Sequence, residues 1–242
     1  MVIARLGDRL QFPDPSQADD DGLVAFGGDL SAPRLIRAYR SGIFPWFEAP
    51  EPYWFSPDPR LVLDPSDIQI SRSLRSLIRR GTFEIRVDSA FPDVIRGCAK
   101  TSRPRQDGST WISERMQAAY TLLFKRAYAH SIECWAGSEL VGGLYGLGLG
   151  RCFFGESMFS KQPNASKTAL VALAAIALER GLAFIDCQVP TPHLISMGAK
   201  EVPRSEFLAR LAEGLRVPTS IRPWSDSWAA RSSTADWLDR MF

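Results

Sequence analysis

The chain has 242 residues, of which 45% are hydrophobic and 11% aromatic, enough to build a sizeable core in one or two domains. Its beginning lacks the apolar run of a signal peptide, and its longest apolar stretch, residues 169–178, is shorter than the roughly 18 residues that span a membrane. The composition therefore argues against a membrane protein and predicts a soluble, cytoplasmic one.

The net charge of +2 conceals a local imbalance. Residues 70–105 carry nine arginines and lysines but only three acidic residues, a local charge of +6 that leaves the rest of the chain at −4. Such segregation of charge is typical of proteins that contact a polyanion.

Cysteine and histidine are too sparse to predict a metal site. The four cysteines show no CxxC spacing, and His130 and His193 are the only histidines. We expect buried, reduced thiols and no multi-histidine metal site.

The first sixty residues are rich in glycine, proline and aromatic residues. A short helix is predicted from a cap at Ser31 to Tyr39. In residues 42–60 the prolines are dense enough to predict no regular secondary structure, whereas aromatic residues such as Trp46 and Trp54 argue against disorder. An ordered small domain packed on aromatic side chains is expected here.

An amphipathic helix is predicted to begin at Ser71. At about 100° per residue, arginines gather on one face and aliphatic residues on the opposite face. Phosphate binding by the arginine face has at least as much support as simple solvation, because further basic residues follow in the sequence. The helix face carries Arg72, Arg75 and Arg79, beside Arg80, and the later basic residues are Arg96, Lys100, Arg103 and Arg105.

A second helix is predicted to begin at Ser113 and to run towards Arg126. Three strands follow, residues 130–135, 139–147 and 151–156. Their connectors are short and contain glycine, so the three strands are expected to form an antiparallel meander.

The next predicted elements are a helix over residues 166–179, capped by Ser166, and a strand over residues 182–187. With the strand before them they make a strand, helix, strand unit. Such a unit implies a parallel strand pair joined by a right-handed crossover.

Two segments, residues 153–160 and 185–190, mix polar and large apolar groups where a core strand would carry aliphatic residues alone. Because side chains alternate along a strand, Asp186 and Gln188 are predicted to share one face and Cys187 to point to the other. Either segment alone fits a strand that ends in a polar loop, but together they indicate a site. Nucleophilic catalysis by Cys187 with a histidine has weak support.

This order of elements resembles the Gcn5-related N-acetyltransferase fold, in which two parallel strands splay around an acyl donor. The two polar segments would be those strands. The resemblance implies an α+β fold with an acetyltransferase-like catalytic domain, residues 63–242, whose tail begins at about 218, and residues 1–62 are expected to form the separate small N-terminal α/β domain. The turn at 161–167 has no glycine and contains Pro163, which lacks an N–H, so an ordinary coenzyme A pyrophosphate site is disfavoured.

Eight motifs follow one another along the chain: GLVAFGGDLS at 22–31, GIFPWF at 42–47, WFSPDPR at 54–60, TWI at 110–112, GGLYG at 142–146, FGESMFS at 154–160, NASK at 164–167 and IDCQ at 185–188. As a set, over residues 22–207, they are similar to the motif series of the leucyl/phenylalanyl-tRNA-protein transferases. Each motif alone is weak, but the set is highly specific. The tail from Pro218 onwards, with three tryptophans, matches none of them.

The resemblance implies a bacterial aminoacyltransferase. Its donor would be aminoacyl-tRNA carrying leucine or phenylalanine, and less well methionine. Its acceptor would be the N-terminal Arg or Lys of a protein, which the new N-degron marks for proteolysis. No cofactor, no membrane and a monomeric chain are expected.

The resemblance also implies roles for residues. The amino-acid pocket would comprise Trp111, Phe153, Gly155, Met158, Leu170 and Ile185, and the aminoacyl-adenosine end would lie among Trp46, Trp111 and Tyr120. Glu156, Asp186 and Gln188 would form the reaction centre, and Arg72, Arg75, Arg79 and Arg80 would hold phosphates of the acceptor stem.

The expected chemistry suits these residues, because an aminoacyl ester is already activated and needs neither ATP nor a metal. Asp186 would orient or deprotonate the attacking amine with help from Gln188, while Glu156 would recognise a cation. The sequence leaves open whether Asp186 is a general base or an orienting charge. An acyl-coenzyme A N-acetyltransferase and a non-catalytic RNA-binding module are the alternatives, although the second gives the three polar residues no task.

Overall fold

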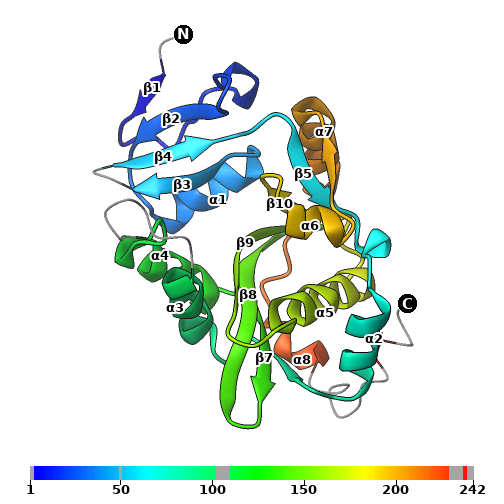
Figure 1. The fold of residues 1–242 in the computed structure, drawn as a ribbon. Coiled ribbons are helices and arrows are strands. Elements are labelled where there is room, and N and C mark those ends of the chain that lie inside the picture. Colours follow the sequence, from blue (N-terminus) through cyan, green and yellow to red (C-terminus); the bar gives the residue numbers. More distant parts are fainter. Residues whose placement is uncertain (1–2, 49–50, 102–109, 229–236, 239–242) are drawn as a thin grey trace.

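The computed structural model describes residues 3–48, 51–101, 110–228 and 237–238 (Figure 1). Its described strands form two sheets, a four-stranded one in the order β1-β2-β4-β3 and a seven-stranded one in the order β11-β5-β10-β9-β8-β7-β6. Both sheets mix parallel and antiparallel pairs. The chain is therefore a mixed α/β protein, compatible with the predicted α+β class.

The small sheet is built from the N-terminal residues. The prediction of no regular structure over 42–60 is wrong, because the prolines occupy positions that a strand tolerates. Pro45 lies in the edge strand β3, and Pro52 is the first residue of β4, so neither removes a hydrogen bond from the middle of the sheet. The elements here are β1 (Ala4–Leu6), the 3-10 turn Pro15–Gln17, β2 (Leu23–Gly27), α1 (Ala32–Arg40), β3 (Phe44–Glu48) and β4 (Pro52–Phe55).

The large sheet contains the predicted meander β7-β8-β9 and the predicted parallel pair of β9 with β10. Its strand β5 begins at Arg60, so the predicted domain boundary after residue 62 falls inside this strand. The two sheets share one buried core, to which Tyr39 and Trp54 contribute from the small side and Phe154 from the large side. The strands are β5 (Arg60–Leu63), β6 (Glu84–Val87), β7 (Ala129–Ala136), β8 (Glu139–Leu149), β9 (Cys152–Ser160), β10 (Phe184–Gln188) and β11 (Lys200–Val202).

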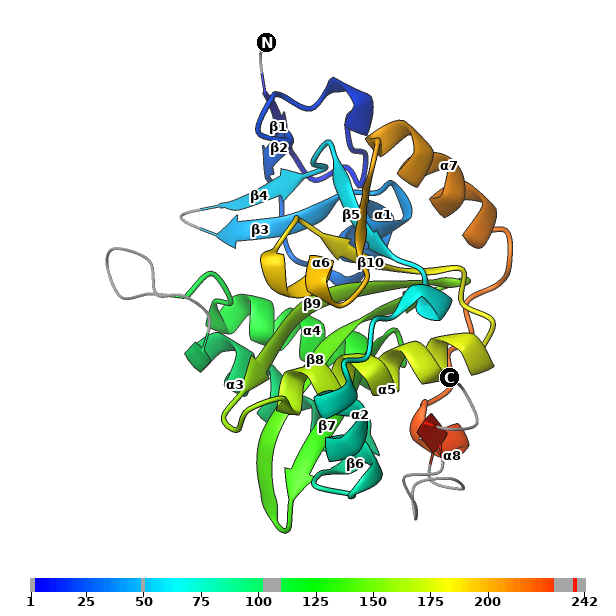
Figure 2. The same cartoon turned by 45° about the vertical axis from the view of Figure 1, so that its right-hand side comes forward.

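Helices cover both faces of the large sheet (Figure 2). Helix α5 lies on one face with α2 packed against it, and α3 and α4 lie on the other. Because α5 is buried nearly all round, its sequence is almost uniformly aliphatic. The elements are the 3-10 turn Pro65–Asp67, α2 (Arg72–Arg79), α3 (Phe91–Thr101), α4 (Glu114–Lys125), α5 (Ala165–Glu179), α6 (Pro192–Ser196), α7 (Arg204–Gly214) and α8 (Ser225–Trp228).

The predicted helix caps agree with the structure with one exception. Ser113 caps α4 by accepting a hydrogen bond from the backbone of Met116. The cap predicted at Ser166 is wrong, because the N-cap of α5 is Asn164, two residues earlier, in the left-handed conformation. Asparagine tolerates that conformation better than most residues, so the turn needs no glycine.

Two β-bulges lie where β9 and β10 separate. The parallel pairing ends at Phe154 and Asp186. On β9, Glu156 is the extra residue between two positions paired with β8, and on β10, Cys187 is the extra residue between two positions paired with β5. Each bulge redirects the side chains that follow it.

The described part of the C-terminal tail packs on the large sheet. The Trp224 ring stacks on His130 with 4.2 Å between centroids, and the Trp228 indole donates a hydrogen bond of 3.0 Å to the carbonyl of Ile85. Trp237 and Leu238 are buried as well. Within the described ranges, no helix combines the length and the apolar character needed to cross a lipid bilayer.

Candidate active site

A cavity of about 400 Å³ opens where β9 and β10 stop pairing. Its walls come from β8, β9 and β10, from α5 and α6, from Trp46 in β3 and from Trp111 just before α4. The buried side chains Leu170, Leu173 and Ile185 form its inner part, whereas Trp46 and Trp111 are only half-buried. The cavity thus has an apolar interior and an aromatic outer wall.

Most of the predicted site residues line this cavity. Phe153 does not, because its buried ring packs on Trp224, with 5.4 Å between centroids. Tyr120 is buried behind the wall, and Asp186 lies on the other side of β10. The predicted residues that line the cavity are Trp46, Trp111, Gly155, Glu156, Met158, Leu170, Ile185 and Gln188.

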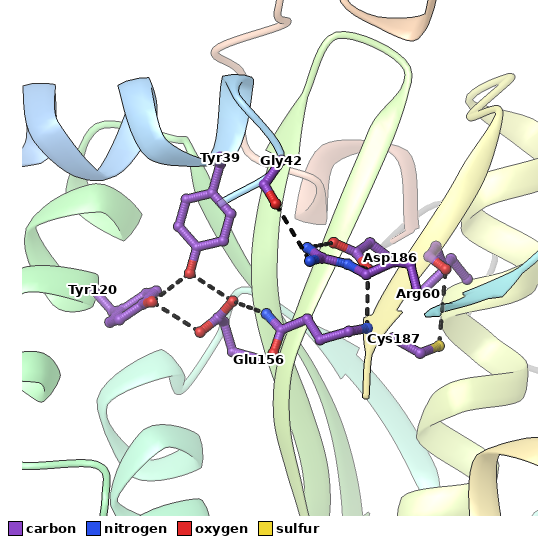
Figure 3. Close-up of polar contacts among 9 residues, drawn as sticks. Tyr39, Gly42, Arg60, Tyr120, Glu156, Asp186 and Cys187 are labelled. Carbon is purple, nitrogen blue, oxygen red and sulfur yellow. Dashed lines mark hydrogen bonds and ion pairs between the residues drawn. The ribbon is translucent and has the colours of Figure 1, made fainter. Parts of the chain in front are cut away.

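Glu156 is the centre of a buried hydrogen-bond network (Figure 3). Its Oε1 accepts hydrogen bonds from the Tyr39 hydroxyl at 2.7 Å and from Gln188 Nε2 at 2.8 Å, and its Oε2 accepts one from the Tyr120 hydroxyl at 2.8 Å. The two tyrosine hydroxyls are 2.5 Å apart. Three donors therefore hold one carboxylate at the cavity wall.

Burial raises the pKa of Glu156 to about 7, although the three hydrogen bonds oppose the shift by favouring the ionised form. Burial and the Glu156 charge raise the pKa of Tyr39 and Tyr120 well above their usual range, so both remain hydrogen-bond donors. A carboxyl with a pKa near neutrality, at the edge of a cavity, is suited to take and return protons.

Asp186 forms a fully buried ion pair with Arg60. Arg60 Nε donates to Asp186 Oδ1 at 2.8 Å, and Arg60 Nη2 donates to Asp186 Oδ2 at 2.7 Å. Both side chains have no exposed surface. Oδ1 also accepts the backbone N–H of Gln188 at 2.9 Å. Both carboxylate oxygens thus have partners within the protein.

The prediction that Asp186 and Gln188 share a face is wrong. Alternation fails because Cys187 is the extra residue of a bulge and Gln188 has a φ of 63°, outside the strand conformation. Asp186 consequently faces Arg60, and Gln188 faces Glu156.

Cys187 and His193 both line the cavity. Alternation along the strand had predicted that Cys187 points away from the site. Burial raises the pKa of the Cys187 thiol far above neutrality, so it is not a thiolate nucleophile. Its three fellow cysteines are buried, and all four are unpaired. Among the residues that the structure describes, no group of three or more histidine, cysteine or acidic side chains is arranged to hold a metal ion.

The arginine face predicted after Ser71 is present on α2. Leu74 and Ile78 are buried against the protein, whereas Arg72 and Arg79 are exposed and Arg75 is half-buried. Arg80 follows as the C-cap and donates to the Ser76 hydroxyl at 2.7 Å. Arg96 pairs with Asp93, and Arg103 and Arg105 lie outside the described residues. The basic face belongs to the helix that packs on α5, which forms a wall of the cavity.

Sequence reasoning assigned no role to Tyr39 or Arg60. A signal for Arg60 was present: one arginine precedes the aliphatic run of β5 and one aspartate interrupts the apolar β10, and two such buried charges need each other. Tyr39 gave no comparable signal, since a tyrosine at the end of an amphipathic helix is ordinary.

Comparison with known proteins identifies the family. Residues 62–212 match the family model described as leucyl/phenylalanyl-tRNA protein transferase, and residues 28–58 match the model for the N-terminal domain of that transferase. The chain belongs to this family. Both polar segments and the whole cavity fall within the matched residues, and the predicted family is confirmed.

Individual relatives in the family cover nearly the whole chain. A leucyl/phenylalanyl-tRNA-protein transferase of Anaeromyxobacter dehalogenans is 52% identical over 225 residues, 93% of this chain and 96% of its own length. The transferase of Thiobacillus denitrificans is 55% identical over 209 residues, which are 86% of this chain and 90% of its own length. That of Syntrophus aciditrophicus is 48% identical over 239 residues, 98% of each. As a family member, the chain is an aminoacyltransferase.

Proposed function

We propose that the chain transfers leucine or phenylalanine, and less well methionine, from a charged tRNA to the N-terminal Arg or Lys of a protein. The transferred amino acid becomes the new N-terminal residue and marks that protein for proteolysis. The observation that carries this proposal is the family match across both sheets. The cavity at the separated strands supports it with a place for the donor. We further propose that the chain acts as a monomer in the cytoplasm.

The amino-acid side chain is proposed to enter the inner, apolar part of the cavity, between α5 and β10. Leu170, Ile185 and the half-buried Met158 would contact it. Side chains unbranched at Cβ share such a pocket, and a hydrophobic pocket distinguishes one methylene by only about 1 to 3 kcal/mol, so limited use of methionine follows. The half-buried Trp46 and Trp111, which line the outer part of the cavity, would contact the terminal adenosine, since bases stack on aromatic side chains.

The proposed reaction is aminolysis of the aminoacyl ester. The acceptor α-amine nitrogen bonds to the ester carbonyl carbon, the ester C–O bond breaks, and the terminal ribose oxygen of the tRNA leaves as a hydroxyl. The proton lost by the amine passes to the Glu156 carboxylate and then to the leaving oxygen. The pKa of Glu156 near 7 fits it for both steps, and Gln188 holds its Oε1.

Asp186 is proposed to be a positioning residue. A proton acceptor must reach the amine directly or through one water, whereas Asp186 is fully buried and does not line the cavity. Of the two roles left open by the sequence, the orienting charge therefore has the support, and Glu156 takes the role of the base.

The acetyltransferase-like architecture of residues 63–242, with a separate small N-terminal domain, is also a proposal. Parallel strands that part around a cavity support it. The start of α5 differs from a pyrophosphate site, since the N–H groups of Ala165 and Ser166 already donate to Gln162 and Ser160 within the chain. This arrangement favours a donor carried on RNA over coenzyme A.

The experiment that tests the function measures transfer of labelled leucine from charged tRNA to a peptide that begins with arginine. Transfer is expected with arginine or lysine first, and not after acetylation of the peptide N-terminus. Ribonuclease treatment of the donor should abolish it. Absence of transfer, or transfer that survives ribonuclease, contradicts the proposal.

A further inference from the structure

A buried arginine outside the cavity is connected to it by an unbroken series of hydrogen bonds (Figure 3). Arg60, the first residue of β5, donates two hydrogen bonds to Asp186, and Nη1 donates a third, of 3.3 Å, to the carbonyl of Gly42. Its guanidinium lies between the rings of Phe44 and Phe207, at 4.8 and 4.4 Å from their centroids. The small sheet, the large sheet and α7 therefore all contact this one group.

The next connection is from Asp186 to the backbone of Gln188. Gln188 is one of four described non-glycine residues with a positive φ. That conformation is unfavourable for a side chain with a Cβ and persists only where the surroundings enforce it. The Asp186 carboxylate accepts the Gln188 N–H at 2.9 Å, which stabilises the backbone in this conformation.

The last connection is from Gln188 to Glu156. With φ at 63°, the Gln188 side chain turns towards β9, and its Nε2 reaches Glu156 Oε1 at 2.8 Å. In a regular strand Gln188 would lie on the same face as Asp186 instead. The backbone conformation of Gln188 therefore sets one of the three hydrogen bonds that hold Glu156.

Arg60 makes this arrangement possible because a fully buried carboxylate needs a paired cation. Without one, Asp186 would take up a proton or move towards water, and in either case it would lose the fixed geometry that holds Gln188. The two parallel N–H groups of a guanidinium fix both carboxylate oxygens at once, which the single ammonium of lysine cannot do.

We propose that Arg60 is a positioning residue for aminoacyl transfer, acting through Asp186 and the backbone of Gln188 to hold the Glu156 carboxylate at the cavity wall. The inference rests on the proposed function, since it assigns Arg60 a part in that reaction. A purely structural role, in which Arg60 only joins the two sheets, is the competing explanation.

The test compares Arg60→Lys with Arg34→Lys. Arg34 is the matched control because it too is fully buried, pairs with Asp29 and donates to the carbonyls of Gly7 and Arg9, and none of these partners among the described residues lines the cavity. Steady-state transfer of labelled leucine gives kcat and KM for each variant, and thermal melting reports stability. Transfer by the unchanged chain tests the proposed function, and only the differences between variants test Arg60.

Arg60→Lys is expected to lower kcat at least about tenfold, with the KM for charged tRNA within about twofold, because a small misplacement of reacting groups costs rate. Arg34→Lys is expected to lower the melting temperature and to leave kcat within about twofold. In a Gln188→Ala background, Arg60→Lys should change kcat by less than about twofold, since residues that act as a unit are not additive.

Three results overturn the inference. The first is an unchanged kcat in Arg60→Lys, and the second is a loss of kcat in Arg34→Lys as large as that in Arg60→Lys. The third is that Arg60→Lys lowers kcat by the same factor whether or not the chain also carries Gln188→Ala. If Arg60→Lys melts below the assay temperature, Asp186→Asn, which preserves the side-chain shape, replaces it in the same comparison. The same expectations then apply, because Asp186→Asn removes the charge that the guanidinium binds.

Discussion

At the scale of single residues, the environment of Glu156 decides the chemistry. A carboxyl in water is ionised at neutral pH and is a weak base. Burial raises the pKa of Glu156 to about 7, and its three donors hold it in place. The same residue can therefore accept a proton from an amine and return it to a leaving oxygen.

The raised pKa of Glu156 predicts a pH-dependent cost in stability. The folded state holds the proton more tightly than the unfolded state, whose glutamate has an ordinary pKa of 4.5, so stability falls as pH rises from about 4.5 through 7. At pH 8 the cost is about 3 kcal/mol. Glu156→Gln removes this titration, so the free energy of unfolding of the variant relative to the unchanged chain should be higher at pH 8 than at pH 5, as measured by urea unfolding at both pH values.

The control for that measurement is Glu139→Gln, because Glu139 is an exposed residue on β8. Glu139→Gln is expected to change the free energy of unfolding by less than about 0.5 kcal/mol at either pH. The raised pKa would be contradicted if the difference in free energy of unfolding between Glu156→Gln and the unchanged chain were the same at pH 5 and pH 8.

Sequence patterns could identify Glu156, Asp186 and Gln188 but could not place them. Alternation along a strand puts residues two apart on one face, and the extra residue Cys187 breaks that rule. A bulge depends on which backbone groups pair across strands, which a single sequence does not contain. The partner of Asp186 lies 126 residues away, so no local pattern shows the ion pair with Arg60, and its one sequence signal is a single charge in each of two apolar strands.

At the scale of elements, periodicity and caps predicted four helices (α1, α2, α4 and α5) and four strands (β7 to β10), fewer than half of the described helices and strands. The arginine face of α2, the cap at Ser113 and the meander β7-β8-β9 all agree with the prediction. Strands β3 and β4 were missed because proline density outweighed their aromatic content. An edge strand tolerates proline, but which strand lies at an edge is a property of the assembled sheet.

The arginine face of α2 predicts salt-dependent binding of charged tRNA. Arg75→Ala with Arg79→Ala should weaken binding and reduce the slope of log K against log salt by about 1 to 2, since each phosphate contact releases close to one counterion. Filter binding at several salt concentrations measures both quantities.

A charge-matched control for α2 is Arg5→Ala with Arg216→Ala. These two exposed arginines pair with Glu51 and Glu213 on other parts of the surface. The control is expected to leave the slope nearly unchanged. Equal effects of the two double variants would mean that net charge, and not the face of α2, governs binding.

At the scale of the whole molecule, the small sheet takes part in the site. Tyr39 of α1 donates to Glu156, and the carbonyl of Gly42 accepts from Arg60. Both contacts cross from the N-terminal elements to the large sheet. The cavity wall therefore depends on the packing of the two sheets together, which composition alone did not predict.

The described part of the C-terminal tail, whose role the sequence did not predict, packs on the large sheet. Trp224 lies between His130 and the Arg180 guanidinium, which is 4.9 Å from its ring centroid. Trp224→Ala is expected to lower the free energy of unfolding, measured with urea, by about 3 to 5 kcal/mol, because it removes a buried indole. Its kcat for transfer, measured below the melting temperature, should stay within about twofold, since Trp224 does not line the cavity.

The control for the tail is Ile221→Ala, since Ile221 is 61% exposed. It is expected to change the free energy of unfolding by less than about 0.5 kcal/mol. A stability change in Trp224→Ala as small as that of Ile221→Ala would show that the tail does not contribute to folding.

The most direct test of Glu156 as the proton acceptor is the pH dependence of kcat for leucine transfer, with both substrates saturating. In the unchanged chain kcat should rise with a midpoint near pH 7, the pKa of Glu156. In Glu156→Gln that midpoint should disappear and kcat should fall about 100-fold or more, while an ionisation of the acceptor amine near 8 persists in both. A Glu156→Gln variant that keeps the midpoint near pH 7 and the rate of the unchanged chain would contradict the account.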